Sequence, residues 1–320
     1  LFLIVALWGT NGLVQGLGWP ALARIFMAWF PDPKQRGFWY GVLSTNQNLG
    51  SALVPVVLVP AIHAFSWPAA LWVPALVGIT VALVLFCFLR DDPTDGPPTH
   101  AGGRGSASSS MGSEVLTKVF GNRALWHLGA TYFLVSVIRS GLGNWAVSFL
   151  RESWHLSPDQ ASTCIFLLEV GGCSGSLAGG LVSDKVFGGL RSPVIAGCCL
   201  ILAIPVALLA RPGLFPTDIA PYVAYVCYFA AGVTAFTPHV LIGLAAREWS
   251  PSHLHSTAGG MVKFIAQVGG ASAGLPLGML VDSYGWSVGI HMMTVLTVLG
   301  GCTMLPLWSR RSYRPEAKGP

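Results

Sequence analysis

The sequence predicts an all-α, multi-pass membrane protein, from its composition and from the length of its apolar stretches. Of its 320 residues, 53% are hydrophobic and only 10% are charged, and the mean hydropathy is +0.62. Soluble domains carry about 25% charged residues, so this chain would expose large apolar patches in water. The net charge of +5 is modest, and no basic stripe with interleaved aromatic residues indicates nucleic-acid binding. The expected environment is therefore the lipid bilayer.

Nine stretches of the chain are long and apolar enough to cross a bilayer as helices, which takes about 20 residues each. Only helices and closed barrels satisfy their backbone polar groups within lipid, and these stretches are far too long for barrel strands. Their approximate ranges are 1–29, 37–62, 67–89, 124–150, 160–182, 193–210, 219–246, 257–281 and 286–308.

A polar segment divides the nine stretches into three and six. Residues 91–121 are rich in Pro, Gly and Ser, a composition typical of a flexible surface linker. We therefore expect an N-terminal part over 1–90, a cytoplasmic linker over 91–121, a six-helix half over 122–309 and a tail over 310–320. The chain opens inside an apolar run with no basic segment before it, so we expect no signal peptide and a true beginning upstream of Leu1.

The lysines and arginines orient these helices in the membrane. With the linker in the cytoplasm, fourteen of the 18 fall on the inner side and two on the outer side, and Arg139 and Lys263 fall within spans. This bias agrees with the positive-inside rule. The inner residues are Arg24, Lys34, Arg36, Arg90, Arg104, Lys118, Arg123, Lys185, Arg191, Arg247, Arg310, Arg311, Arg314 and Lys318, and the outer ones are Arg151 and Arg211.

An internal repeat relates the two parts of the chain. Matching residues recur at a separation of about 220; the pairs are Trp29 and Trp249, Pro31 and Pro251, Gln47 and Gln267, Gly50 and Gly270, Trp67 and Trp286, and Pro20 and Pro238. The three helices of 1–90 thus correspond to the last three of 122–309. This is the layout of transporters built from two parallel six-helix repeats, with substrate bound near the midplane. We therefore expect helices four to twelve of a twelve-helix protein.

Two charged residues lie near the middle of predicted spans, where charge is costly and indicates function. Arg139 lies about midway along 124–150, too deep to reach the interface. Its guanidinium suits phosphate oxygens, although a structural ion pair would also explain it. Glu169 lies fifteen residues before Asp184, roughly 22 Å along a helix. It could serve gating or proton coupling, or form a structural pair.

Two further charged residues lie closer to the cytoplasmic ends of spans. Lys263 is six residues into its span, so it could reach the interface or contact substrate. Asp184 lies in the short polar segment GGLVSDKVFGG, where it could cap a helix or brace a neighbouring helix through an ion pair. The seven cysteines all lie in apolar runs without metal or disulfide spacing. We expect no metal, no cofactor and no enzymatic activity, because no catalytic constellation is present.

Several segments resemble the organophosphate:inorganic phosphate antiporters of the major facilitator superfamily. They are NGLVQGLGWPALARIFMAWF with the loop PDPKQRG, VLSTNQNLGSALVP, VIRSGLGNW, FLLEVGGCSGSLAGGLVSDK, FTPHVLIGL and STAGGMVKFIAQVGGASAGLP. The likeness covers nearly the whole chain apart from the linker and tail. LSTNQNLGS, LEVGG and GLP are most similar to the glucose-6-phosphate translocase branch. In the family, a phosphate-binding arginine falls at Arg139 and a buried glutamate at Glu169.

The resemblance implies exchange of a sugar phosphate, above all glucose-6-phosphate, for inorganic phosphate through a monomeric transporter unit. With the residues singled out above, the expected substrate-binding residues are Arg139, Gln47, Phe236, Lys263 and Gln267, and Glu169 and Asp184 are expected in gating or ion pairs. This chain departs from the glycerol-3-phosphate members, which have His at Gln47 and Tyr at Phe236 and Gln267, so selectivity does not carry over.

Two other functions remain open at this stage: a transporter-like hexose-phosphate sensor, and a facilitator for another organic anion or sugar. The resemblance favours the endoplasmic reticulum membrane, with plastid and bacterial inner membranes as alternatives.

Overall fold

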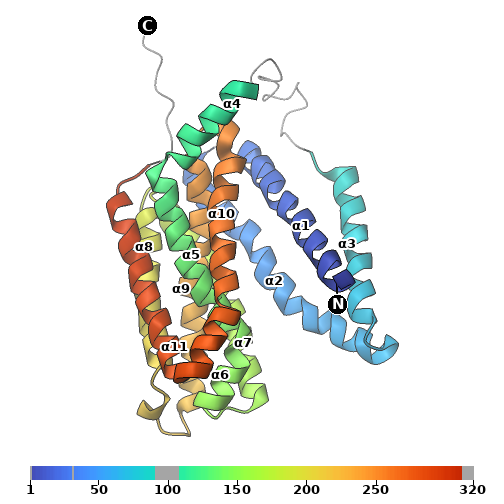
Figure 1. Ribbon diagram of the computed structural model, residues 1–320, viewed down its shortest axis with the longest axis vertical. Coiled ribbons are helices and arrows are strands. Elements are labelled where there is room, and N and C mark those ends of the chain that lie inside the picture. The colour runs from blue at the N-terminus through green and yellow to red at the C-terminus, as the bar shows by residue number, and fades with distance from the viewer. Residues whose placement is uncertain (1, 31, 91–107, 312–320) are drawn as a thin grey trace.

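The computed structural model describes residues 2–30, 32–90 and 108–311, and most of these residues lie in helices (Figure 1). All nine predicted stretches form helices, which confirms the all-α membrane fold. The long elements are α1 (Phe2–Trp29), α2 (Pro33–Phe65), α3 (Ala69–Phe88), α4 (Ser108–Val115), α5 (Arg123–Asn144), α6 (Ala146–Ser153), α7 (Pro158–Lys185), α8 (Ser192–Leu209), α9 (Ala220–Glu248), α10 (His255–Ser272) and α11 (Leu275–Met304). Short turns are η1 (Leu116–Phe120), η2 (Pro212–Leu214), η3 (Ser252–Leu254) and η4 (Leu305–Leu307).

Several predicted spans are interrupted helices. The span predicted over 124–150 consists of α5 and α6, which are bent by 65° relative to each other. The span predicted over 257–281 consists of α10 and the start of α11. In the structure this first part of α11 continues to a break at Gly285, whose φ of 81° is accessible to glycine. The remainder of α11 is the last predicted span.

Some of these helices are both long enough and apolar enough to cross a membrane. In the described ranges five helical stretches qualify, or six if α5 and α6 form one span. The five are Ala69–Phe88, Pro158–Lys185, Ser192–Leu209, Ala220–Glu248 and Ser252–Leu307, the last of which contains two predicted spans. Leu76, Phe86 and Phe88 of α3 are exposed, as expected of side chains that face lipid.

The predicted linker is only partly a structureless connection. Its residues 91–107 lie outside the described residues, as do 312–320 of the predicted tail. Residues 108–120, however, form α4 and the π-helical turn η1. Lys118 and Glu114, one turn apart, form an ion pair with Nζ and Oε1 2.5 Å apart, and Val119 is fully buried. A favourable i,i+4 pair and an apolar anchor thus stabilise a helix that the polar composition did not predict.

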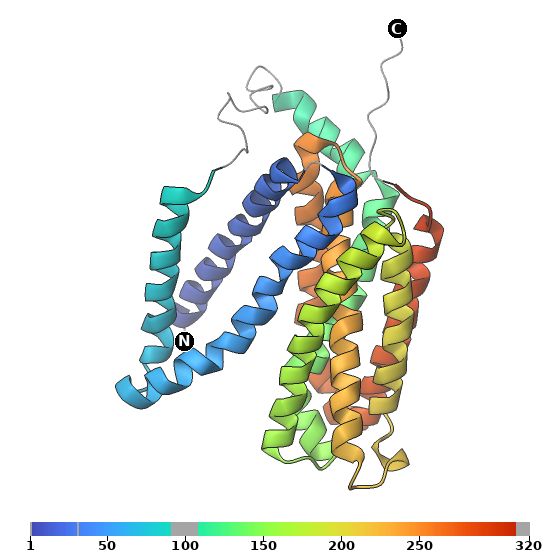
Figure 2. The ribbon, with the colours of Figure 1, turned by 180° about the vertical axis from the view of Figure 1, so that it is seen from behind.

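The helices of 1–90 contact the C-terminal helices mainly at the end of the molecule that carries the linker. There α2 packs against α7, and α1 contacts α10. Toward the opposite end, α1–α3 diverge from the C-terminal bundle in both views (Figures 1 and 2). The two parts are therefore closed together at the linker end, which the lysine and arginine bias places in the cytoplasm.

Glycines on α7 allow close approach of helices on two sides. A Cβ on Gly175 would clash with the Val233 backbone of α9, and one on Gly180 would clash with the Gly37 backbone of α2. On α2, a Cβ on Gly41 would clash with the Ser176 carbonyl. Small residues permit such backbone contact between membrane helices, so the α2–α7 contact depends on them.

Candidate functional site

The guanidinium of Arg139 lies over the ring of Phe236, with Cζ 4.8 Å from the ring centroid. The fold thus brings together two predicted substrate-binding residues from α5 and α9. Arg139 is half-buried, and within the ranges 2–30, 32–90 and 108–311 no carboxylate lies within ion-pair distance of it. A cation–π contact orients a guanidinium without neutralising it. The described part of the structure therefore leaves this charge available to an anion.

Glu169 lies half-buried on α7. Its backbone carbonyl accepts a 3.5 Å hydrogen bond from the Asn48 amide of α2, and Asn48 is buried. In the described residues the Glu169 carboxylate is not in an ion pair with Arg139. The structure thus places Glu169 at the contact between the two parts of the chain.

A small cavity lies between α2, α5, α9 and α10. It contains two of the predicted residues, Gln47 and Lys263, whereas Gln267 lies on α10 four residues beyond Lys263 and is exposed. The Lys263 ammonium donates a 3.3 Å hydrogen bond to the Tyr132 hydroxyl. The charge of Lys263 thus faces the cavity, and contact of Lys263 with substrate stays a prediction. The lining residues are Tyr40, Ser44, Gln47, Tyr132, His239, Val240, Gly243, Arg247, Gly259 and Lys263.

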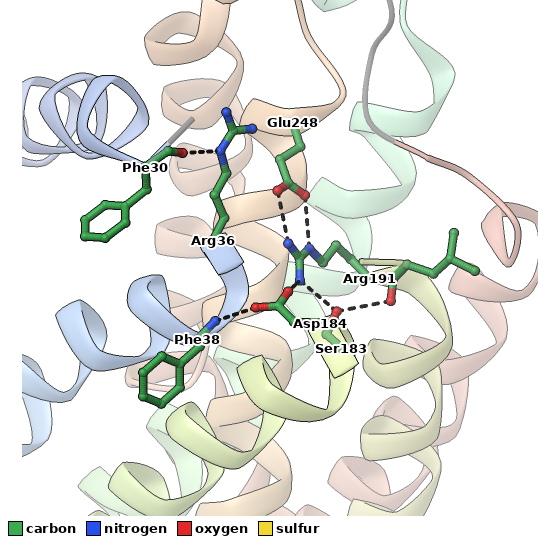
Figure 3. A network of polar contacts seen from close by, with 8 residues as sticks. Phe30, Arg36, Phe38, Ser183, Asp184, Arg191 and Glu248 are labelled. Carbon is green, nitrogen blue, oxygen red and sulfur yellow. Dashed lines mark hydrogen bonds and ion pairs between the residues drawn. The ribbon is translucent and has the colours of Figure 1, made fainter. Parts of the chain in front are cut away.

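A buried network of charges joins α2, α7 and α9 at the linker end (Figure 3). Arg191, which precedes α8, donates to both carboxylate oxygens of Glu248 at 3.0 and 3.1 Å. It also donates to Asp184 Oδ1 at 2.5 Å, and Asp184 Oδ2 accepts a 2.8 Å hydrogen bond from the Phe38 amide. Burial alone would lower the pKa of Arg191, but the carboxylates of Glu248 and Asp184 raise it above its ordinary value. This arginine is therefore fully charged.

The network and the cavity contain two residues that the sequence analysis did not place there. Arg191 and Arg247 were expected at the cytoplasmic interface, yet only 1% and 3% of their surfaces are exposed. Arg191 holds two carboxylates and Arg247 lines the cavity. A cation at the end of an apolar run has the same sequence pattern whether its side chain reaches water or turns inward. For Arg247, the packing of α9 against α2 and α10 decides that the side chain turns inward.

Comparison with known proteins identifies the class to which this fold and site belong. Residues 1–274, and in an overlapping match residues 128–320, match the Major Facilitator Superfamily. A "Probable hexose phosphate transport protein" of Chlamydia pneumoniae is 31% identical over 97% of this chain and 72% of its own length. The membrane sensor protein UhpC of Escherichia coli K12 is 31% identical over 98% of this chain and 73% of its own.

A third relative is named for a different organic phosphate. The glycerol-3-phosphate transporter of Bacillus subtilis is 28% identical over 93% of this chain and 69% of its own length. The chain therefore belongs to the major facilitator superfamily and, within it, to the organophosphate:phosphate antiporter family. It is a transporter-family membrane protein and not an enzyme.

Proposed function

We propose that this protein exchanges a sugar phosphate, most favourably glucose-6-phosphate, for inorganic phosphate. In this proposal the substrate binds between the two halves, and the halves rock so that the site opens to each side of the membrane in turn. Arg139 holds the phosphoryl group, and Phe236 orients the guanidinium. Gln47, Lys263 and Gln267 contact the rest of the substrate.

The observation that carries this proposal is the state of Arg139. Its charge lies deep in a membrane helix, flat against Phe236, without a carboxylate partner in the described ranges. An unpaired charge in such a place is costly, and a phosphate dianion would bind the planar guanidinium through two parallel hydrogen bonds. The relatives named as hexose phosphate and glycerol-3-phosphate transporters support the same class of substrate.

The charged network of Figure 3 supports the alternation of the site. Asp184 and Arg191 belong to the C-terminal half, and Phe38 to the helix α2 of the other part. We propose that this contact keeps the linker end closed while the opposite end is open, and that it separates when the site turns to the cytoplasm. Glu169, beside the same interface, would respond to the charge of Arg139 as substrate arrives.

The experiment that tests the proposal is exchange in liposomes. The full-length protein is reconstituted in liposomes loaded with inorganic phosphate and offered labelled glucose-6-phosphate or glycerol-3-phosphate. We expect uptake of glucose-6-phosphate that depends on internal phosphate and stops when the liposomes contain only phosphate-free buffer of equal osmolarity. Absence of exchange with both substrates would remove the transport assignment.

A second candidate function is a hexose-phosphate sensor, favoured by the similarity to the membrane sensor protein UhpC. A sensor would bind glucose-6-phosphate with negligible flux. Equilibrium binding measured beside the liposome flux separates the two, because binding without flux supports the sensor.

We place the protein in a bacterial membrane and no longer favour the endoplasmic reticulum. The relatives named above come from bacteria. Fractionation of the source cells with an antibody to the protein tests this assignment.

A further inference from the structure

The buried arginine Arg247 lies in the cavity together with Lys263, at a different level of the molecule from Arg139. On α5, Tyr132 lies beside Lys263 and precedes Arg139 by seven residues, which is roughly 10 Å along the helix. Arg247 is the second-last residue of α9. The cavity is therefore displaced from Arg139 toward the linker end.

In the part of the chain that the structure describes, Arg247 is held in place by neutral groups. Its Nη1 donates to the Tyr40 hydroxyl at 3.1 Å and to the Gly243 carbonyl. Its Nε has no hydrogen-bond partner among the described residues. A Cβ on Gly259 would lie 2.9 Å from the Arg247 Cζ, so the absence of a side chain there gives the guanidinium room against α10.

The positive charge of the cavity is not balanced by its lining. Arg247 and Lys263 both line it, and none of the ten lining residues is acidic. Glu248, the neighbour of Arg247 in sequence, has both carboxylate oxygens bound to Arg191. Two cations so close together with an unsatisfied N–H favour the entry of an anion.

Resting on the proposed function, we infer that this cavity is a second anion subsite, which takes inorganic phosphate or the phosphoryl group of the sugar phosphate. The cavity is now about the size of a single water molecule. Tyr40, Ser44 and Gln47 come from α2, and the other lining residues come from the C-terminal half. Separation of the two halves at the linker end therefore widens the cavity. The subsite binds the anion when the protein is open to the cytoplasm.

Side-specific kinetics test this subsite. Exchange is measured in right-side-out and inside-out vesicles, with inorganic phosphate and glucose-6-phosphate each varied on one side. For Arg247→Gln we expect a half-saturation concentration about tenfold higher or more on the cytoplasmic side, the loss expected for a charge-assisted hydrogen bond. The value on the opposite side should change less than about twofold. Equal changes on both sides, or none, would overturn the subsite, and the anion that shows the effect identifies the ligand.

A pair of glycine variants tests the subsite without removing a charge. Gly259→Ala pushes against the tip of Arg247, whereas the adjacent Gly260→Ala has open space around its Cβ. We expect the same one-sided loss in Gly259→Ala and wild-type behaviour in Gly260→Ala. Indistinguishable behaviour of the two variants would count against Arg247 as a ligand.

Equilibrium binding separates a failure of this inference from a failure of the proposed function. If the wild-type protein shows no exchange, binding of inorganic phosphate to the purified protein is measured by calorimetry. Binding that Arg247→Gln weakens about tenfold or more supports the subsite without transport. Binding unaffected by Arg247→Gln, or absent from the wild type, overturns it.

Discussion

The backbone amide of Phe38 donates a 2.8 Å hydrogen bond to Asp184, and this bond joins α2 to α7. The other oxygen of Asp184 is held by Arg191, which also binds Glu248. Three helices are thus connected through one buried guanidinium.

We predict that Asp184→Ala loosens the closed linker end. The hydrogen bond from the Phe38 amide to Asp184 crosses between the two parts of the chain. A hydrogen bond to a charged group contributes about 1.5–3 kcal/mol, and its loss falls on the state in which α2 and α7 are in contact. A cysteine introduced at Ser44, a buried residue of the cavity, should then react with maleimide at least about tenfold faster from the linker side. The measurement uses inside-out vesicles in a background in which the native cysteines are replaced by serine.

The matched control for that variant is Glu114→Ala. This residue also forms an ion pair, with Lys118, but the pair is partly exposed on the surface. Surface pairs contribute little, so labelling at position 44 should not change. An equal increase in both variants would show that Asp184 does not hold the closure.

A second prediction concerns the close approach of α2 and α7. Gly180→Val would place side-chain atoms against the Gly37 backbone, where a rigid carbonyl cannot move aside. We expect loss of exchange and a lower melting temperature, because overpacking at a tight contact costs about 1–3 kcal/mol or more. Gly197→Val on α8, where a Cβ would meet no neighbour within 4 Å, should keep both properties. Thermal unfolding in detergent, followed by tryptophan fluorescence, and the liposome assay check this pair.

Much of the fold could be predicted from the sequence because the bilayer imposes a simple rule on it. Hydropathy located all nine helical stretches. The repeat pair Trp67 and Trp286 also predicted that α3 and the last segment of α11 are equivalent helices of the two repeats. The helix over 108–120 was not predicted, because its polar sequence contains no apolar period. The Glu114–Lys118 pair and the burial of Val119 stabilise it instead.

The candidate site was predictable in part. Arg139 stood out because a charge in mid-span is rare, and the fold places it on Phe236, 97 residues further along the chain. Arg247 did not stand out, since its place at the end of an apolar run is where the positive-inside rule expects a cation. The inward turn of its side chain follows from the room left by Gly259 and from the Tyr40 hydroxyl. Both are contacts between distant segments, which a single sequence does not contain.

A third prediction concerns the indole of Trp145, at the bend between α5 and α6. Its Nε1 donates a 2.7 Å hydrogen bond to the carbonyl of Ala273, where α10 gives way to α11. Trp145→Phe keeps an aromatic ring but leaves that carbonyl without the indole donor. We expect a loss of about 1 kcal/mol of stability and a slightly lower melting temperature. An unchanged melting temperature would mean that the two interrupted helices are held by packing alone.

The last prediction is that Arg139→Lys abolishes exchange while the protein still inserts and folds. A lysine keeps the positive charge, but its ammonium is a point charge that cannot make the two parallel hydrogen bonds of a guanidinium to one phosphate, and it loses the flat contact with Phe236. Exchange of labelled glucose-6-phosphate in phosphate-loaded liposomes should fall at least about tenfold to a hundredfold. The matched control is Arg151→Lys on α6, an exposed arginine expected on the outer side, which should exchange at the wild-type rate. Because both variants conserve charge, a selective loss at position 139 can only come from the geometry of the guanidinium, whereas wild-type exchange by Arg139→Lys would remove this residue from the phosphate site.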